Sequence, residues 1–136
     1  LVIVSDLDKD AILSKLSFLN NWAPKEVKLP ELTFKYDRNK TEVYLVDQPY
    51  AAQSTIYIGY LAMPFDYNGE YFKANVMNFP LGGNFNSRIN LNLREEKGFT
   101  YGSGTYFVGG TFPGPFTFSS SVKQRATDSA IVEVFK

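Results

Sequence analysis

The stretch LGGNFNSRINLNLREEKGFTY, residues 81–101, contains the signals that decide the fold. Gly82 and Gly83 open it, and a backbone without Cβ atoms can take a positive φ, as in a tight turn, or let another chain come close. A helix is expected next, capped by Asn84 or Asn86, because a short polar side chain accepts hydrogen bonds from the free N–H groups of a first helical turn. We therefore predict a turn at the glycine pair and a helix directly after it.

The predicted helix has one apolar face and a clear end. Ile89 and Leu93 lie four residues apart, so we expect both on the face that points into the core. The residues expected to face away are Asn90, Asn92, Glu95 and Glu96. Lys97 and Gly98 predict the end, since a cation complements the last carbonyls and glycine adopts the left-handed conformation beyond the cap. Residues 99–101, Phe-Thr-Tyr, favour the start of a strand.

Two hydrogen-bond donors lie on either side of this stop, Arg94 near the end of the predicted helix and Tyr101 at the start of the strand. We expect both on one surface, directed away from the core, where a guanidinium and a phenol can each donate to peptide carbonyls. The alternative is that Arg94 pairs with Glu95, Glu96 or a helix end and that Tyr101 is a half-buried strand residue. Residue types alone favour this local pairing, because most charged helix residues are solvated or paired nearby.

A set of short motifs in this stretch resembles the insulinase (pitrilysin) family of zinc peptidases, which includes the mitochondrial processing peptidases. The motifs are Leu81-Gly82-Gly83, Ser87-Arg88-Ile89, Leu93-Arg94-Glu95 and Lys97-Gly98-Phe99-Thr100-Tyr101-Gly102. Residues 43–54, VYLVDQPYAAQS, look like the first strand and turn of the family's C-terminal domain, and the likeness extends over most of the chain. One departure is Phe79-Pro80, where the family usually has an uninterrupted helix. A proline here should end the preceding helix early.

Composition narrows the class of protein. A chain of 136 residues is long enough for one domain with a hydrophobic core. The net charge of zero shows no basic footprint that would suggest binding to nucleic acid or anionic membranes, and no apolar run approaches the roughly 20 residues of a membrane span. The sequence has no cysteine and no histidine, the latter being the commonest metal ligand and the usual general base. We therefore expect no metal site and no catalytic residue in this chain.

The residue patterns in the rest of the chain predict strands that alternate with helices. The strands expected from β-branched and aromatic runs are residues 1–5, 41–47, 53–63, 103–111 and 115–123. The helices expected from apolar spacing are residues 9–22, capped by Asp8 or Asp10, residues 70–79, and a last helix from about residue 126. The apolar stripes expected to be buried are Phe72, Val76 and Phe79 in the second of these helices and Ile131, Val134 and Phe135 in the last.

Proline and glycine residues mark the connections between these predicted elements. Residues 23–32 contain Pro24 and Pro30 and predict a surface connector, for which an ordinary loop is favoured over a hinge between two domains. Gln48-Pro49 marks a turn, and residues 112–114, Phe-Pro-Gly, predict the turn of a hairpin.

The resemblance implies a role for the central stretch. The family's catalytic domains carry His-x-x-Glu-His on a helix, in which two imidazoles bind zinc and the glutamate activates water. This sequence has no such motif, so the chain looks like the C-terminal, non-catalytic ("inactive") domain. In the family, an arginine and a tyrosine seven residues apart in this stretch bind the substrate peptide near the scissile bond. Arg94 and Tyr101 match them in type and spacing, and the resemblance therefore favours substrate binding. Gly82, Gly83 and Gly98 are then structural turn residues.

We therefore expect a single α+β domain over residues 1–136, a two-layer antiparallel or mixed sheet with helices on one face, like the metallohydrolase fold of the mitochondrial processing peptidases. Residues 1–32 would supply a strand, a helix and a connector that lead into the core. Compared with the domains of the family, the chain lacks the later helices and the closing strand. It is expected to be a fragment of the C-terminal domain, incomplete at its C-terminal end.

The expected function is that of a non-catalytic domain of a zinc-dependent metalloendopeptidase, forming one wall of a peptide-binding chamber and inactive alone. The alternative is a catalytically inert scaffold or assembly subunit with the same fold. The expected partners are a peptide substrate and a catalytic domain or subunit that carries His-x-x-Glu-His and the zinc ion, with no nucleic acid. We expect a soluble protein of bacterial type, in the cytoplasm or the periplasm.

Overall fold

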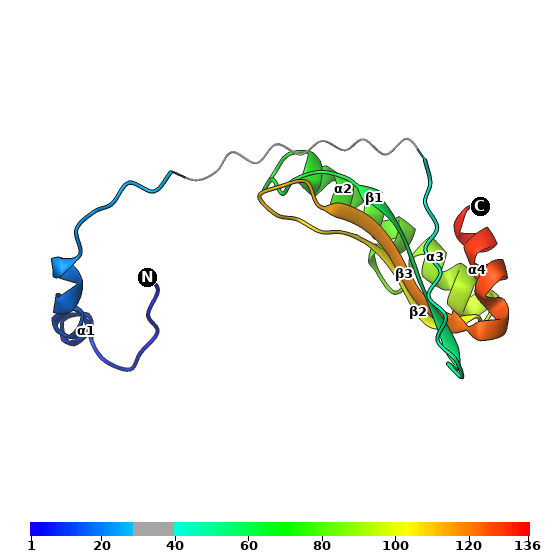
Figure 1. Ribbon diagram of the computed structural model, residues 1–136, viewed down its shortest axis with the longest axis horizontal. Helices are drawn as coiled ribbons and strands as arrows, with labels where there is room; N and C mark the ends of the chain where they lie inside the picture. Colours follow the sequence, from blue (N-terminus) through cyan, green and yellow to red (C-terminus); the bar gives the residue numbers. More distant parts are fainter. Residues whose placement is uncertain (29–39) are drawn as a thin grey trace. The chain divides into compact units, whose positions relative to one another are not determined.

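A computed structural model describes residues 1–28 and 40–136 (Figure 1). The chain divides into two units, Leu1–Lys35 and Tyr36–Lys136. Among the described residues, no helix is long and apolar enough to cross a membrane. The last four residues of the predicted connector, 29–32, lie outside the described residues.

The first unit contains helix α1 (Lys9–Lys15) and a 3-10 helix, η1 (Ser17–Asn21). Asp8 caps α1, because its carboxylate accepts hydrogen bonds of 2.9 Å from two backbone N–H groups of the first turn. One of the two predicted caps is thus confirmed, and the helix predicted over residues 9–22 is divided at Leu16.

The strand predicted over residues 1–5 is wrong. These residues have no regular secondary structure, and their side chains are exposed. Their β-branched composition favours a strand, but a strand also needs a neighbour that completes its backbone hydrogen bonds. The described part of the first unit contains no such neighbour.

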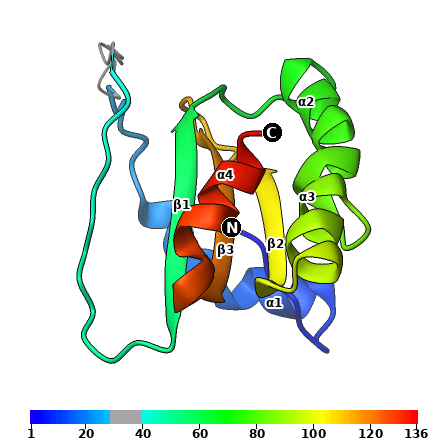
Figure 2. The ribbon, with the colours of Figure 1, turned by 90° about the vertical axis from the view of Figure 1, so that its right-hand side faces the viewer.

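The second unit is an α+β structure built on an antiparallel sheet with the strand order β1-β3-β2 (Figure 2). Its elements in chain order are β1 (Gln53–Leu61), α2 (Glu70–Asn78), the π-helix η2 (Phe79–Gly83), α3 (Arg88–Asn90), the π-helix η3 (Leu91–Glu96), β2 (Thr100–Phe107), β3 (Pro115–Lys123), the 3-10 helix η4 (Gln124–Ala126) and α4 (Thr127–Val134). The predicted α+β class, the hairpin of β2 and β3, and the three helical regions are confirmed.

The strand predicted over residues 41–47 is also wrong. These residues are exposed and have no regular structure, although the turn that follows them is present. The Ala51 N–H donates to the Gln48 carbonyl over 3.2 Å, and Tyr50 adopts a left-handed φ of 65°. Alternating apolar residues fit a half-buried pleated surface, but here the segment does not pair with β1.

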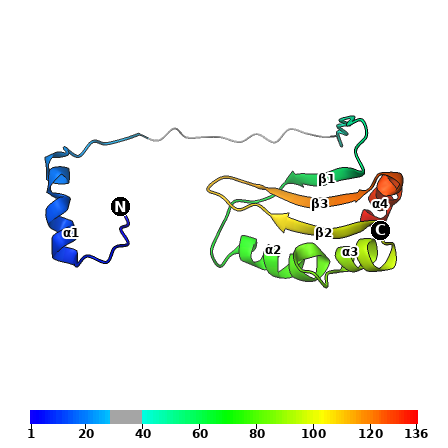
Figure 3. The ribbon, with the colours of Figure 1, turned by 90° about the horizontal axis from the view of Figure 1, so that it is seen from below.

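Helices pack on the sheet in two places (Figure 3). The segments α2–η2 and α3–η3 run along β2, the strand at one edge of the sheet. Helix α4 instead packs against β1, β3 and η3. Helix α4 therefore fills the corner between the sheet and the helical segments that run along β2.

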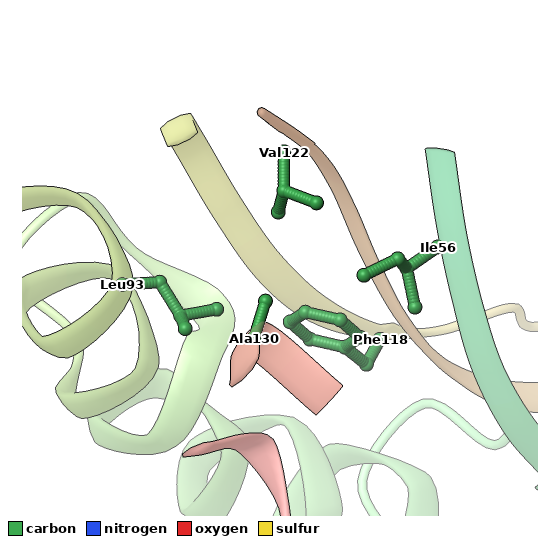
Figure 4. Packing of buried hydrophobic residues seen from close by; sticks show 5 residues of the cluster. All are labelled: Ile56, Leu93, Phe118, Val122 and Ala130. Carbon is green, nitrogen blue, oxygen red and sulfur yellow. The ribbon is translucent and has the colours of Figure 1, made fainter. Parts of the chain in front are cut away.

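The hydrophobic core lies in this corner. Its buried cluster contains Ile56 of β1, Leu93 of η3, Phe118 and Val122 of β3, and Ala130 of α4 (Figure 4). The predicted inward position of Leu93 is confirmed, and Ile89 packs against the same cluster.

The inward face of α4 differs in part from the prediction. Val134 packs against the core as expected, but Ile131 and Phe135 are exposed. The fully buried residue is Ala130, with the buried Ala126 four positions earlier. Small side chains allow α4 to come close to the sheet, so the larger apolar residues are left on its outer side.

The predicted buried stripe of α2 is wrong. Phe72, Val76 and Phe79 are all more than half exposed, and the buried residue of α2 is Asn78. Asn78 faces β2, where it hydrogen-bonds to Thr105. The helix contacts an edge strand whose backbone groups need polar partners, so its contact face is polar.

The α-helix ends at Asn78, two residues before Pro80, as the proline predicted. The chain then continues through one π-helical turn, η2, with Pro80 near its start. Proline is tolerated there because the N–H groups of a first turn have no partner within the helix.

Candidate functional site

The stop between η3 and β2 has the geometry that the sequence predicts. Gly98 has a left-handed φ of 61°. The Phe99 N–H donates to the Leu93 carbonyl over 2.9 Å, and the Lys97 N–H donates to the Asn92 carbonyl over 3.0 Å. These two bonds satisfy carbonyls at the helix end and turn the chain sharply into β2. Gly98 is therefore a structural turn residue, as predicted.

Arg94 and Tyr101 lie on either side of this turn and line the same hollow, of about 290 Å³. The other residues that line it are Gln53, Glu95, Gly98, Phe99, Thr100 and Lys123. Tyr101 is 87% exposed, and the Arg94 side chain is 32% exposed. The turn thus brings a guanidinium and a phenol to one surface, and the role of the two side chains in substrate binding stays a prediction.

Arg94 has two partners among the described residues. Its guanidinium forms an ion pair with the neighbouring Glu95 and stacks over the Phe85 ring, with the guanidinium carbon 4.4 Å from the ring centroid. The local pairing that residue types favour is therefore present. A guanidinium has five N–H donors in a planar fork, so one carboxylate leaves others available. The Tyr101 hydroxyl forms no hydrogen bond with any described residue.

Asn90 holds the helix against the strand and was not recognised from the sequence. It was expected to face away, which is wrong, since it is almost completely buried. Its side-chain amide donates to the Phe85 carbonyl over 2.7 Å, and its side-chain oxygen accepts from the Ser103 N–H over 2.9 Å. The loop that carries Phe85, the helix that carries Arg94 and the strand that carries Tyr101 are thereby linked.

Gly82 and Gly83 act through close packing rather than through an unusual backbone conformation. Neither has a positive φ. A Cβ atom on Gly82 would lie 2.1 Å from Oγ1 and 2.7 Å from the backbone nitrogen of Thr105 in β2. At Gly83 it would lie 3.1 Å from the Asn78 carbonyl oxygen. Both glycines lie at the end of η2, where they allow close packing against residues of this chain.

The predicted caps at Asn84 and Asn86 are wrong, because Ser87 occupies the cap position of α3. The Ser87 carbonyl accepts the first helical hydrogen bond, of 2.9 Å, from the Leu91 N–H. Asn84 is engaged locally instead, since its side-chain oxygen accepts from the Asn86 N–H over 2.7 Å.

The described residues do not gather the usual ligands of a zinc ion. The sequence contains no histidine or cysteine, and within residues 1–28 and 40–136 no group of three or more acidic residues is placed to hold a metal. The hollow that Arg94 and Tyr101 share therefore offers hydrogen-bond donors and positive charge. Such groups can bind a carbonyl oxygen or an anion.

Two comparisons with known proteins agree on the family. The model of the peptidase M16 inactive domain matches residues 1–136, which is the whole chain. A crystal structure of a peptidase M16 inactive domain from Pseudomonas fluorescens is similar, with a TM-score of 0.58 and 25% sequence identity. The similarity covers 62% of this chain and 20% of that chain, so this chain spans about a fifth of the solved one. A search of curated proteins found no significant match.

Proposed function

This chain belongs to the peptidase M16 inactive-domain family, and from that premise we propose that it is the non-catalytic domain of a zinc-dependent metalloendopeptidase. In this proposal the zinc ion and the His-x-x-Glu-His helix belong to a catalytic domain or subunit. The present chain forms one wall of the chamber in which a peptide is held.

The observation that carries the proposal is the shared hollow of Arg94 and Tyr101. The two side chains lie seven residues apart, and the Gly98 turn places both on one surface. A residue that served stability alone would be buried or fully engaged, but the Tyr101 ring is exposed and its hydroxyl has no partner among the described residues. This arrangement suits donation to the backbone of another chain.

The chemistry that these residues can supply is electrostatic. Arg94 can donate through the N–H groups that Glu95 does not use, and Tyr101 can donate through its hydroxyl. A peptide carbonyl gains negative charge as water attacks it, so donors aimed at its oxygen bind the transition state more strongly than the ground state. When bound to the catalytic partner, zinc would supply the activated water.

The test uses the chain together with its catalytic domain or subunit. We expect Arg94→Ala and Tyr101→Phe each to lower kcat by roughly tenfold to a thousandfold if the contact strengthens in the transition state. If the contact only holds the substrate, KM rises and kcat stays unchanged. Arg88→Ala is the matched control, because Arg88 is an exposed arginine of the same helical segment that does not line the hollow.

A second candidate function is a catalytically inert scaffold that only assembles a complex. The observation that favours it is the pairing of Arg94 with Glu95 and Phe85 inside the chain. Unchanged kcat and KM in both Arg94→Ala and Tyr101→Phe, with zinc content and folding intact, would contradict substrate binding and support the scaffold.

A further inference from the structure

A second hollow, of about 200 Å³, adjoins the one that Arg94 and Tyr101 line. The two hollows have Gly98, Phe99 and Lys123 in common. A ligand that extends along this surface from Tyr101 across the Gly98 turn therefore enters the second hollow. The lining of the second hollow differs in charge from the lining of the first.

The lining of the second hollow contains three cations and no carboxylate. Lys97 directly follows η3 as its cap residue, Lys123 is the last residue of β3, and Arg125 lies in η4. The remaining residues of the lining are Gly98, Phe99, Ala126 and Ser129. Three positive charges from three separate elements are thus gathered around one concave surface.

These cations have no ion-pair partner among the described residues. The charge of Lys97 acts on the carboxylate of Glu133. The pKa of Glu133 is lowered first by a hydrogen bond from Lys136 and least by the charge of Lys97. Like charges held near one another repel, so an anion that enters the hollow relieves this repulsion and gains attraction from each cation.

We infer that this cationic hollow, defined by Lys97, Lys123 and Arg125, binds a carboxylate of the peptide that Arg94 and Tyr101 hold. The inference rests on the proposed function of those two residues and adds the class of substrate. A carboxylate is the anion that an unmodified peptide contains, either as an aspartate or glutamate side chain or as the C-terminus. The domain then selects peptides with negative charge on one side of the contacted backbone segment.

The experiment measures peptide binding to the full protein with its catalytic partner, whose zinc-site glutamate is replaced so that no cleavage occurs. Four fluorescent peptides share one sequence: one blocked at both ends, one with a free C-terminal carboxylate, one with an aspartate, and one with a lysine at the aspartate position. We expect the carboxylate peptides to bind about threefold to tenfold more tightly than the blocked peptide. This gain should shrink at high salt, because the screening length is only about 10 Å at 0.1 M.

The double variant Lys97→Gln, Arg125→Gln removes two cations that line only the second hollow. It should abolish the gain from the carboxylate and leave the affinity for the blocked peptide unchanged. The charge-matched control is Lys9→Gln, Lys73→Gln, since these two residues line neither hollow. A gain with the free C-terminus alone assigns the site to peptide ends, and a gain with aspartate alone assigns it to acidic side chains.

The failures of the two proposals differ. If Arg94→Ala weakens all four peptides but the four peptides bind the unmodified protein equally, the carboxylate site is refuted and the proposed function stands. If no peptide binds, or if binding does not respond to Arg94→Ala and Tyr101→Phe, both are refuted. A carboxylate gain that the control variant also abolishes reflects net charge and refutes the hollow as the site.

Discussion

Asn78 of α2 and Thr105 of β2 are joined by two hydrogen bonds that close the outer edge of the sheet. The Asn78 amide donates to the Thr105 carbonyl over 2.8 Å, and the Thr105 hydroxyl donates to the Asn78 side-chain oxygen. Both residues are buried, at 3% and 4% exposure. The Tyr71 hydroxyl donates to the next outward carbonyl, that of Phe107, over 3.1 Å. Side chains of the helix thus satisfy backbone groups that a neighbouring strand would otherwise pair.

We expect Asn78→Ala to lower the free energy of unfolding by about 2–4 kcal/mol, because it leaves a buried carbonyl and a buried hydroxyl without partners. The measurement is urea unfolding of the full protein. Val76→Ala is the control on the same helix and should change stability by less than about 0.5 kcal/mol, since Val76 is exposed. Equal losses in the two variants would show that the apolar stripe is buried after all.

This contact also explains why the buried face of α2 could not be predicted from the sequence. Hydrophobic spacing identifies a buried face when the partner surface is apolar, as it is for Leu93 in the core. The partner of α2 is a strand edge, so the contact residues are Tyr71 and Asn78 while Phe72 and Val76 are exposed. The signal available in the sequence was the polar series Tyr71, Asn75 and Asn78 at helical spacing.

Local signals predicted the site better than long-range ones. The helix stop at Gly98 and the position of Arg94 and Tyr101 around it depend on a few neighbouring residues, and the geometry of that stop is as predicted. The burial of Asn90 depends on Ser103, thirteen positions later, and a strand over residues 41–47 depends on a partner. Neither dependence is visible in a local pattern.

Gly82 sets how closely η2 approaches β2. We expect Gly82→Ala to destabilise the protein by about 1–3 kcal/mol or more, since its Cβ would overlap the Thr105 backbone nitrogen, which cannot move without shifting the strand. Thermal unfolding followed by circular dichroism measures the loss. Gly102→Ala is the control, because a Cβ there meets no atom within 4 Å. A Gly82→Ala protein as stable as this control would contradict the close contact.

Gly98 is required for its backbone conformation rather than for space. A Cβ at this position meets nothing within 4 Å, but the φ of 61° is unfavourable for other residues. We expect Gly98→Ala to cost about 1 kcal/mol and Gly98→Asn to cost less, because asparagine tolerates the left-handed region. Urea unfolding of the two variants gives the comparison. Equal costs for alanine and asparagine would mean that steric contact, and not φ, governs this position.

Glu133 makes the contact between α4 and η3 sensitive to acid. Its pKa is lowered from the ordinary value of 4.5, first by a hydrogen bond from Lys136 and also by one of 3.2 Å from the Asn92 amide, against the opposing effect of desolvation. The folded protein therefore favours the charged carboxylate, and this stabilisation is fully present above pH 4.5. It is lost as the pH falls through the lowered pKa.

We therefore expect Glu133→Gln to be less stable than the unmodified protein at neutral pH, with a difference that shrinks as the pH falls below 4.5. Urea unfolding midpoints measured across this range give the comparison. Glu96→Gln removes the same charge from an exposed residue of η3 and serves as the control. A Glu133→Gln deficit that stays constant with pH would show that the carboxylate does not titrate against the Lys136 and Asn92 contacts. The same pH dependence in Glu96→Gln would assign the effect to net charge instead.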